Sequence, residues 1–462
     1  MDSLRKENFH KSVTMRIILF LILFSVNLKP QTDLYHKISQ MIMVGFSGKT
    51  LTDSVIINDL QIRGVGSVIL FGGNIESPTQ LNQLTTQLHS NSSQPLFIAI
   101  DQEGGRIARL RETNGYSTTY TAYQIGTIFN DENITRNWAA QMAGWLSDAK
   151  INLNLAPVAD VNVNPESPAI GFLDRSFSRI PDTVFNHCLW FIDEFHQRNV
   201  LTSLKHFPGH GSAATDSHLG FTDITNTWAD SELIPYRRII QDGYDNFIMS
   251  GHLYNAQIDS VYPASLSHKT LTTLLRDSLG FDGLIITDGM FMGAISNNYT
   301  FDEAVELAIN AGNDILLYTT NKLNGKSLVD SVVGIVMNKI SQGKITEQRI
   351  NDSFTRIMQK KQKITSIKYS DSEIIPKDYF VANYPNPFNA TTQIVFYLPS
   401  DQNVSLKVFN TIGEEVIDLE NNFYSAGTHT IRLNANELSS GVFLLRMKAG
   451  EFYVSHKIIL LK

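Results

Sequence analysis

The densest group of chemically active side chains in this 462-residue chain lies between residues 205 and 218. The segment Lys205-His-Phe-Pro-Gly-His-Gly211 is followed closely by Asp216-Ser-His218. A histidine donates and accepts a proton near neutral pH, and a carboxylate beside it fixes its tautomer and favours its protonated form. Because they are two residues apart in an expected loop, Asp216 and His218 can form an acid–base dyad.

Two other interpretations of these histidines have to be weighed. His206 and His210 are four residues apart, a spacing that would place two metal ligands on one face of a helix. Pro208-Gly209 between them prevents a helix, and the chain has no HExxH sequence. We therefore expect no metal and no other cofactor. A purely structural role in a glycine-rich loop remains open for His210.

A second segment, Gly283-Leu-Ile-Ile-Thr-Asp288, ends an apolar run in a carboxylate. At such a position Asp288 can serve as a nucleophile, a base or a metal ligand. Together with a proton donor at His218, a carboxylate nucleophile suggests glycoside cleavage by double displacement, with a histidine in place of the usual second carboxylic acid. The spacing alone does not decide between these chemistries.

Strands and helices alternate in the region that must position these groups. The expected strands are Met41–Phe46, Val65–Phe71, Pro95–Ile100, Ile151–Val158, Leu201–His206, Phe247–Ser250, Leu284–Thr287 and Asp314–Tyr318. The expected helices between them include Thr135–Lys150, Asp182–Arg198, Ser231–Gln241, His268–Leu279 and Asp302–Ala311. Continuous apolar runs are typical of strands buried on both faces, so eight such units predict an α/β fold, a (β/α)8 barrel of the TIM type. An open doubly wound sheet is the alternative, which the absence of GxGxxG after the first run disfavours.

Polar residues follow several of these expected strands. They are Asp101-Gln-Glu-Gly-Gly-Arg106, Asp160, Lys205-His206, Gly251-His252 and Thr287-Asp288. In a (β/α)8 barrel the active site is built at the carboxyl ends of the strands. The pattern therefore predicts one site shared by these segments.

The composition limits the class of protein. The chain is 42% hydrophobic with a formal net charge of −7, which excludes wholesale disorder and argues against a nucleic-acid partner. Its single cysteine, Cys188, excludes an intramolecular disulfide framework and a cysteine-rich zinc module. The length predicts two or three structural units.

The first 32 residues have the pattern of a secretory signal peptide. Met15-Arg16 precede an unbroken apolar run from Ile17 to Phe24, which is shorter than the about 20 residues that span a bilayer. An N-terminal membrane anchor is the alternative, and Met15 is a second candidate for the start of the protein. We expect the protein to be exported.

The C-terminal part has a different pattern. After an expected linker at residues 367–381, short strands are expected at Ile394–Leu398, Val404–Phe409, Val416–Leu419, Thr430–Leu433, Val442–Met447 and Phe452–Leu461. They predict a small β-sandwich over residues 382–462. A carbohydrate-binding module is one interpretation, which the absence of tryptophan in this region disfavours.

Four segments in order resemble glycoside hydrolase family 3, in particular its bacterial β-N-acetylglucosaminidase branch, over about residues 33–366. They are Asp101-Gln-Glu-Gly-Gly-Arg-Ile-Ala-Arg109-Leu, Lys205-His-Phe-Pro-Gly-His-Gly211, Asp216-Ser-His218 and Ile286-Thr-Asp288. The resemblance implies a single catalytic barrel that removes terminal N-acetylglucosamine with retention of configuration. Other members of the family carry a second domain with a catalytic glutamate, and nothing after residue 366 resembles it.

The resemblance also implies residue roles. Asp288 would be the nucleophile and His218 the general acid/base, with Asp216 as its partner on a mobile loop. The sugar would be bound by Asp101, Arg109, Arg175, Lys205 and His206. We expect Glu103 to support this pocket without touching the sugar. Gly289 follows the nucleophile where the family commonly has an acidic residue.

Three segments of the tail resemble the type A sorting domain of the type IX secretion system. They are Asn383-Tyr-Pro-Asn-Pro-Phe-Asn389, Val408–Val416 and Leu438–Arg446. The resemblance implies passage through the periplasm and then across the outer membrane, after which the protein is released or anchored at the cell surface.

We therefore expect a secreted or surface-bound exo-β-N-acetylhexosaminidase that acts as a monomer. Its partners would be a carbohydrate substrate and the type IX secretion machinery. The alternatives are a β-N-acetylglucosaminide phosphorylase, another β-glycosidase of the same family, and a silent carbohydrate-binding protein. The substrate stays open between a peptidoglycan fragment, a chitin oligosaccharide and another glycan.

Overall fold

The computed structural model describes residues 33–370, 379–384 and 386–462. The chain divides into two compact units, Met1–Thr365 and Ser366–Lys462. The expected signal peptide at residues 1–32 lies outside the described residues, as does most of the expected linker at 367–381. No helix among the described residues is long and apolar enough to cross a lipid bilayer.

The first unit is built around a parallel sheet of eight strands in the order β10-β1-β2-β3-β4-β5-β7-β9. Its strands are β1 (Ile42–Gly45), β2 (Ser67–Leu70), β3 (Phe97–Ile100), β4 (Leu153–Asn154), β5 (Leu201–Phe207), β7 (Phe247–Ser250), β9 (Leu284–Thr287) and β10 (Leu316–Tyr318). A parallel bridge between Ile286 and Ile315 joins the two ends of the sheet. The predicted (β/α)8 barrel is thus confirmed, and all eight expected strands are present.

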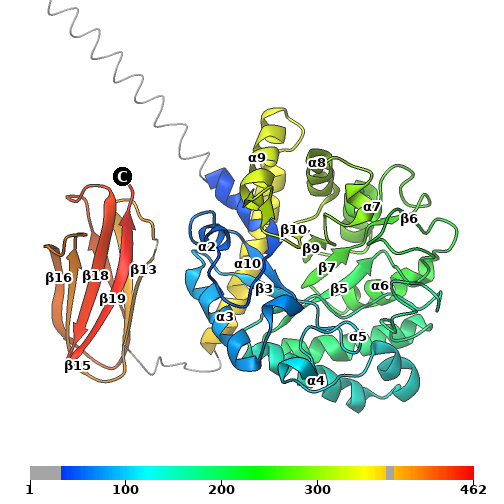
Figure 1. The fold of residues 1–462 in the computed structure, drawn as a ribbon, viewed down its shortest axis with the longest axis horizontal. Helices are drawn as coiled ribbons and strands as arrows, with labels where there is room; N and C mark the ends of the chain where they lie inside the picture. Colours follow the sequence, from blue (N-terminus) through cyan, green and yellow to red (C-terminus); the bar gives the residue numbers. More distant parts are fainter. Residues whose placement is uncertain (1–32, 371–378, 385) are drawn as a thin grey trace, which may run out of the picture. The chain divides into compact units, whose positions relative to one another are not determined.

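Burial on both faces explains why these strands are continuous apolar runs. Every residue of β1, β2, β3, β7 and β9 is buried. Alternate side chains fill the interior of the barrel and pack against the surrounding helices. The helices lie on the outside of the strands (Figure 1).

The α-helices of this unit are α2 (Ser54–Gln61), α3 (Pro78–Asn91), α4 (Glu132–Asp148), α5 (Pro181–His196), α6 (Ile234–Gln241), α7 (Gly293–Ser296), α8 (Phe301–Ala311), α9 (Leu328–Ser341) and α10 (Glu347–Ser370). Five of them, α2, α3, α4, α8 and α9, begin directly after a residue whose side chain caps the helix. The Asp131 side chain accepts a hydrogen bond from the Ile134 N–H, so α4 begins three residues before the expected start. The expected helix at His268–Leu279 is a π-helix, Lys269–Ser278.

Shorter elements connect these helices and strands. There is a second π-helix at Gln124–Phe129 and 3-10 turns at Gly72–Asn74, Glu112–Asn114, Asp230–Leu233 and Ala264–Leu266. Two-residue strands form the pairs β6 (Thr222–Asp223) with β8 (Leu253–Tyr254) and β11 (Lys322–Leu323) with β12 (Lys326–Ser327). Helix α10 reaches Ser370, four residues into the range expected to be a linker.

The second unit is an antiparallel β-sandwich, as expected. One sheet has the order β13-β14-β17 and the other β16-β15-β18-β19. The strands are β13 (Phe380–Tyr384), β14 (Thr391–Leu398), β15 (Gln402–Phe409), β16 (Glu415–Tyr424), β17 (Gly427–Asn434), β18 (Gly441–Ala449) and β19 (Phe452–Leu460). The sequence did not predict β13, which pairs along its whole length with β14.

Candidate active site

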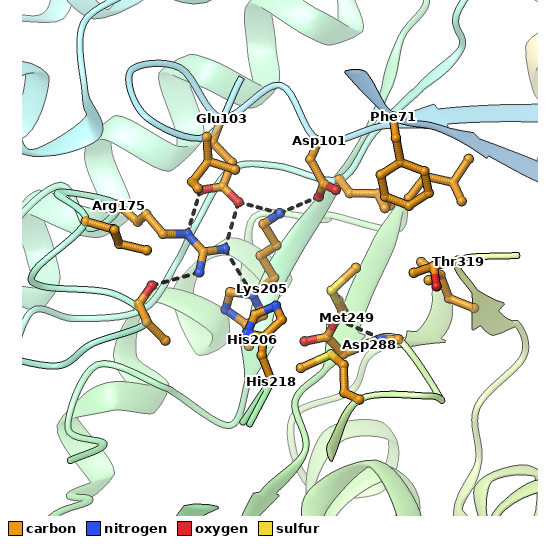
Figure 2. A pocket seen from close by; sticks show the side chains of 18 of the residues that line it. Phe71, Asp101, Glu103, Arg175, Lys205, His206, His218, Met249, Asp288 and Thr319 are labelled. Atoms are coloured by element: carbon orange, nitrogen blue, oxygen red, sulfur yellow. Dashed lines mark hydrogen bonds and ion pairs between the residues drawn. The ribbon is translucent and has the colours of Figure 1, made fainter. Parts of the chain in front are cut away.

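One pocket of about 450 Å³ opens at the carboxyl ends of the barrel strands (Figure 2). Asp101 follows β3, Lys205 and His206 lie in the last three residues of β5, and Asp288 follows β9. The structure brings all eight predicted site residues to this pocket. They are Asp101, Arg109, Arg175, Lys205, His206, Asp216, His218 and Asp288.

Asp101 lies between two cations on one side of the pocket. Its Oδ1 accepts a hydrogen bond from Lys205 Nζ at 2.9 Å, and its Oδ2 accepts one from Arg109 Nη2 at 3.1 Å. Burial would raise the pKa of Asp101, but the charges of Lys205 and Arg109 outweigh it and lower that pKa. Asp101 is therefore an ionised acceptor that lines the pocket.

Glu103 and Arg175 form a buried two-point ion pair beside Asp101. Arg175 Nε and Nη2 each donate to one carboxylate oxygen of Glu103 at 2.8 Å. Lys205 Nζ lies 2.6 Å from Glu103 Oε1. Burial raises the pKa of Glu103, but Arg175 and Lys205 outweigh it and hold that pKa well below its usual range.

Most donors of Arg175 are therefore used inside the protein. Its Nη1 donates to the Ala169 carbonyl at 2.8 Å, and its Nη2 also lies 3.3 Å from His206 Nε2. A guanidinium has five N–H groups, so one remains for a ligand. Arg175 lines the pocket as expected, but its contacts are mainly those of a supporting residue.

The proton of His206 is placed by Asp160, a residue to which the sequence assigned no role. Asp160 Oδ2 lies 2.8 Å from His206 Nδ1, and Asp160 Oδ1 accepts the backbone N–H groups of His206 and His210. Burial raises the pKa of Asp160 and the neighbouring His206 lowers it, with a net lowering. Because the Asp160 carboxylate only accepts hydrogen bonds, Nδ1 of His206 carries a proton.

Asp288 accepts a hydrogen bond from a backbone N–H and lies within electrostatic reach of three histidines. Its Oδ1 accepts the Gly289 N–H at 2.8 Å. Burial raises the pKa of Asp288, but His206, His252 and His218 outweigh it and lower that pKa to about 2. Asp288 is thus ionised at neutral pH, the form that a nucleophile requires.

His252 is a second residue to which the sequence assigned no role. It is buried, and its Nε2 lies 3.0 Å from the Gly289 carbonyl, which only accepts hydrogen bonds. The ring therefore carries a proton on Nε2, and its Nδ1 accepts from Ser265 Oγ at 2.7 Å. His252 fixes the backbone immediately after Asp288.

His218 and Asp216 make the expected pair at the rim of the pocket. His218 Nδ1 donates to Asp216 Oδ1 at 2.7 Å, and the same oxygen accepts the backbone N–H of His218. The His218 side chain is 56% exposed and that of Asp216 is 25% exposed. With Nδ1 engaged, Nε2 is the atom of His218 that can exchange a proton with a ligand.

His206 and His210, the two histidines four residues apart, bond to different neighbours. His206 Nδ1 is held by Asp160, and His210 Nε2 lies 3.1 Å from Ser217 Oγ. Burial, with a smaller effect of His206, lowers the pKa of His210 to about 4. In the part of the chain that the structure describes, no group of three or more His, Cys, Asp or Glu side chains is arranged to hold a metal ion.

Comparison with known proteins places these features in a family. The glycosyl hydrolase family 3 N terminal domain matches residues 33–360, and the secretion system C-terminal sorting domain matches residues 382–461. A β-hexosaminidase A of Pseudoalteromonas piscicida is 32% identical over 322 residues, which are 65% of this chain and 54% of that protein. A β-hexosaminidase of Tolumonas auensis is 36% identical over 276 residues, 58% of this chain and 79% of that protein.

Solved structures give the same result. A family 3 β-N-acetylglucosaminidase from Paenibacillus sp. FPU-7 is similar with a TM-score of 0.67 and 30% identity, covering 72% of this chain and 62% of that one. A β-N-acetylhexosaminidase from Beutenbergia cavernae is similar with a TM-score of 0.65 and 29% identity, covering 71% of this chain and 98% of that one. The chain thus spans a little over half the length of the Pseudoalteromonas relative and nearly all of the Beutenbergia structure.

Proposed function

Since the chain belongs to glycosyl hydrolase family 3, we propose that it is an exo-acting β-N-acetylhexosaminidase that removes terminal β-linked N-acetylglucosamine with retention of configuration. The observation that carries this proposal is the meeting of two different groups in one pocket. Asp288 is an ionised, buried carboxylate, and His218 is an exposed imidazole whose second nitrogen is held by Asp216. A nucleophile and a proton donor are what a double displacement requires.

In the first step, a carboxylate oxygen of Asp288 forms a bond to the anomeric carbon of the sugar. The bond from that carbon to the leaving oxygen breaks, and the leaving oxygen takes its electron pair and a proton from His218 Nε2. The carboxylate of Asp216 stabilises the imidazolium that donates this proton. The product is a glycosyl ester of Asp288 and a free alcohol.

In the second step, His218, now neutral, accepts a proton from a water molecule as that water attacks the anomeric carbon. The ester bond to Asp288 breaks, and the carboxylate is released in its ionised form. Two inversions at the same carbon give net retention. Because both steps use His218 Nε2, the hydrogen bond between His218 Nδ1 and Asp216 acts in both.

The opposite side of the pocket supplies the contacts that hold the sugar in place. We assign hydroxyl recognition to the ionised Asp101 and to the cations Lys205 and Arg109, since charge-assisted hydrogen bonds are the strong ones. His206 and the remaining N–H of Arg175 complete this polar wall. We assign the C–H groups of the sugar and its acetamide methyl to the apolar part of the lining. It consists of Ile69, Phe71, Ile107, Leu155, Ala169, Leu173, Met249, Met292 and Leu317.

A phosphorylase remains the second candidate because the acid/base is a histidine. An incoming phosphate is an anion, and a carboxylate at the position of His218 would repel it, whereas an imidazole does not. In that reaction phosphate replaces water as the attacking group in the second step.

A chromogenic β-N-acetylglucosaminide, assayed with and without inorganic phosphate, separates these functions. Hydrolysis gives free sugar at a rate that does not depend on phosphate, whereas a phosphorylase gives the sugar 1-phosphate. A matched β-glucoside tests whether the acetamido group is recognised. Absence of turnover on all of these substrates would contradict the proposed activity and favour a binding protein.

For the location of the protein, we infer export by the predicted signal peptide followed by type IX secretion to the cell surface or beyond. The match to a secretion system C-terminal sorting domain over residues 382–461 supports the second step. Fractionation of cells that express the full-length chain and a chain without residues 382–462 tests it.

A further inference from the structure

The loop that carries His218 is attached to the segment that follows Asp288. The backbone N–H of Gly293 donates to the His218 carbonyl at 3.1 Å, and the N–H of Ala294 donates to the Ser217 carbonyl at 3.3 Å. Gly293 is five residues after Asp288 and is the first residue of α7. The backbone of the nucleophile's own loop therefore holds the backbone of the acid/base.

The close approach is only compatible with glycine at position 293. A Cβ atom added there would lie 2.7 Å from the Leu219 carbonyl oxygen, 2.8 Å from the Leu219 carbonyl carbon and 3.1 Å from the His218 carbonyl oxygen. These are backbone atoms, which cannot turn away as the end of a flexible side chain can. Gly293 does not have a positive φ angle, so its backbone conformation does not require glycine. Glycine is required here because there is no room for a Cβ atom.

The loop that carries His218 is also held by buried side chains. Ser217 is buried, and its Oγ lies 3.1 Å from His210 Nε2. The backbone N–H of His210 donates to Asp160 Oδ1 at 2.8 Å, and Asp160 also orients His206. Ser217 thus has a fixed place, while the neighbouring His218 side chain remains 56% exposed.

We propose that Gly293 is a positioning residue, whose missing side chain lets the loop at residues 216–219 close onto α7 and so sets His218 at its working distance from Asp288. The inference rests on the proposed function for its consequences in catalysis. The docking of the loop itself does not depend on what the enzyme cleaves.

The substitution Gly293→Ala inserts a Cβ between the two segments and displaces His218 while leaving Asp288 untouched. General acid assistance accounts for about 10²- to 10⁴-fold of rate. We expect kcat/KM on substrates with poor leaving groups to fall by about 100-fold, and on activated aryl glycosides by only a few-fold. The matched control is Gly334→Ala in α9, where an added Cβ meets nothing within 4 Å.

A double variant distinguishes positioning from a general loss of structure. If Gly293 acts through His218, the double variant Gly293→Ala/His218→Ala should show the same dependence of kcat/KM on the leaving group as His218→Ala alone. Independent, additive losses in the double variant would overturn the proposal.

Limited proteolysis measures the loop itself, whether or not the enzyme turns over a given substrate. Leu219 is 81% exposed and Phe221 is 51% exposed, so both are accessible to chymotrypsin. We expect cleavage after these residues to be several-fold faster in Gly293→Ala than in wild type or Gly334→Ala. Unchanged cleavage would overturn the proposal even if the wild type proved inactive on β-N-acetylglucosaminides, and that inactivity alone would contradict only the proposed function.

Discussion

Glu103 and Arg175 are 72 positions apart in the sequence and are joined by two parallel hydrogen bonds of 2.8 Å in the wall of the pocket. Both side chains are less than a tenth exposed. Through this pair Arg175 also reaches His206, and Glu103 also reaches Lys205. The pair of Glu103 and Arg175 thus orients Lys205 and His206. It shapes the proposed sugar site through them, even if few of its own atoms touch the sugar.

Replacing Arg175 with methionine should destabilise the protein. Glu103 would stay buried with only Lys205 left of its two cationic partners, and breaking a buried pair from one side costs about 3–5 kcal/mol. Chemical denaturation at pH 7 measures this loss. Arg175→Lys should recover little, because lysine cannot make the two-point contact. Arg237→Met, which breaks an exposed pair with Asp230, is the matched control and should change stability by less than about 1 kcal/mol.

Replacing Asp288 with alanine should abolish turnover by several orders of magnitude while the protein stays folded. The side chain is the only ionised carboxylate that we assign to bond formation, and its pKa of about 2 keeps it ionised throughout the neutral range. A fluorinated slow substrate should leave a glycosyl adduct on the wild-type peptide that contains Asp288, detected by mass spectrometry. An adduct on another residue would contradict the assignment.

Replacing His218 with alanine should slow substrates with poor leaving groups far more than activated aryl glycosides. The leaving oxygen needs a proton only when it is a poor leaving group, so the slope of rate against leaving-group acidity should steepen. Asp216→Ala should show a milder form of the same trend, since Asp216 acts through His218 Nδ1. His196→Ala, at an exposed position in α5, is the control. A uniform loss across all leaving groups would indicate a structural role for His218.

The sequence predicted the strands of the barrel well because burial on both faces leaves a plain apolar run. It overestimated one of them: only Leu153–Asn154 of the expected Ile151–Val158 is a strand. Beyond Asn154 the chain stays hydrogen-bonded to β3 and β5 but without a regular ladder, and this detour brings Asp160 to the backbone of His206 and His210. That detour is set by a tertiary contact, which no local pattern encodes.

The same limit applies to the site. Position after an expected strand pointed to Asp101, Lys205, His206 and Asp288, and the spacing of Asp216 and His218 pointed to a dyad. Arg109 and Arg175 came only from the resemblance to the family, and the roles of all eight residues remain predictions. Partner choice was not predictable, because Glu103 with Arg175, Asp160 with His206 and His252 with Gly289 are all long-range pairs. The one available signal for Asp160 and His252 was that each is a polar residue shortly after an expected strand.

Replacing Glu232 with glutamine should stabilise the protein at alkaline pH and not at acid pH. Glu232 is fully buried against Gly209, and the hydrogen bonding of Ser212 opposes the rise in its pKa without outweighing burial. Burial raises its pKa from 4.5 to about 7. The folded protein thus holds a proton that the unfolded chain releases above about pH 4.3, so this contribution to stability is complete below that pH and is lost as the pH rises through 7.

Glutamine mimics the protonated form, so the variant avoids this loss. A raised pKa of this size corresponds to at most about 3 kcal/mol in the free energy of unfolding. Thermal or urea unfolding at pH 4 and pH 8, compared between Glu232→Gln and wild type, measures the effect. An equal difference at both values of pH would show that the proton on Glu232 does not contribute.

Deleting residues 382–462 should leave the activity intact and abolish arrival at the cell surface. The core of the barrel is built from residues between Ile38 and Ile364, and the core of the sandwich from residues between Val381 and Leu460, with no residue in common. Each unit buries its own apolar surface, so each should fold independently. The eight predicted site residues lie between Asp101 and Asp288, and the sheet that holds them is closed by Ile286 and Ile315 without any strand of the tail.

To test the role of the tail, the truncated and full-length proteins are purified and assayed side by side on a small chromogenic substrate, and the cells that express them are fractionated. Equal turnover with retention of the truncated protein inside the cell envelope is the expected result, because the sorting sequence is lost while the catalytic barrel is complete. Loss of turnover on truncation would show that the sandwich is part of the enzyme, and secretion of the truncated protein would show that another segment directs it.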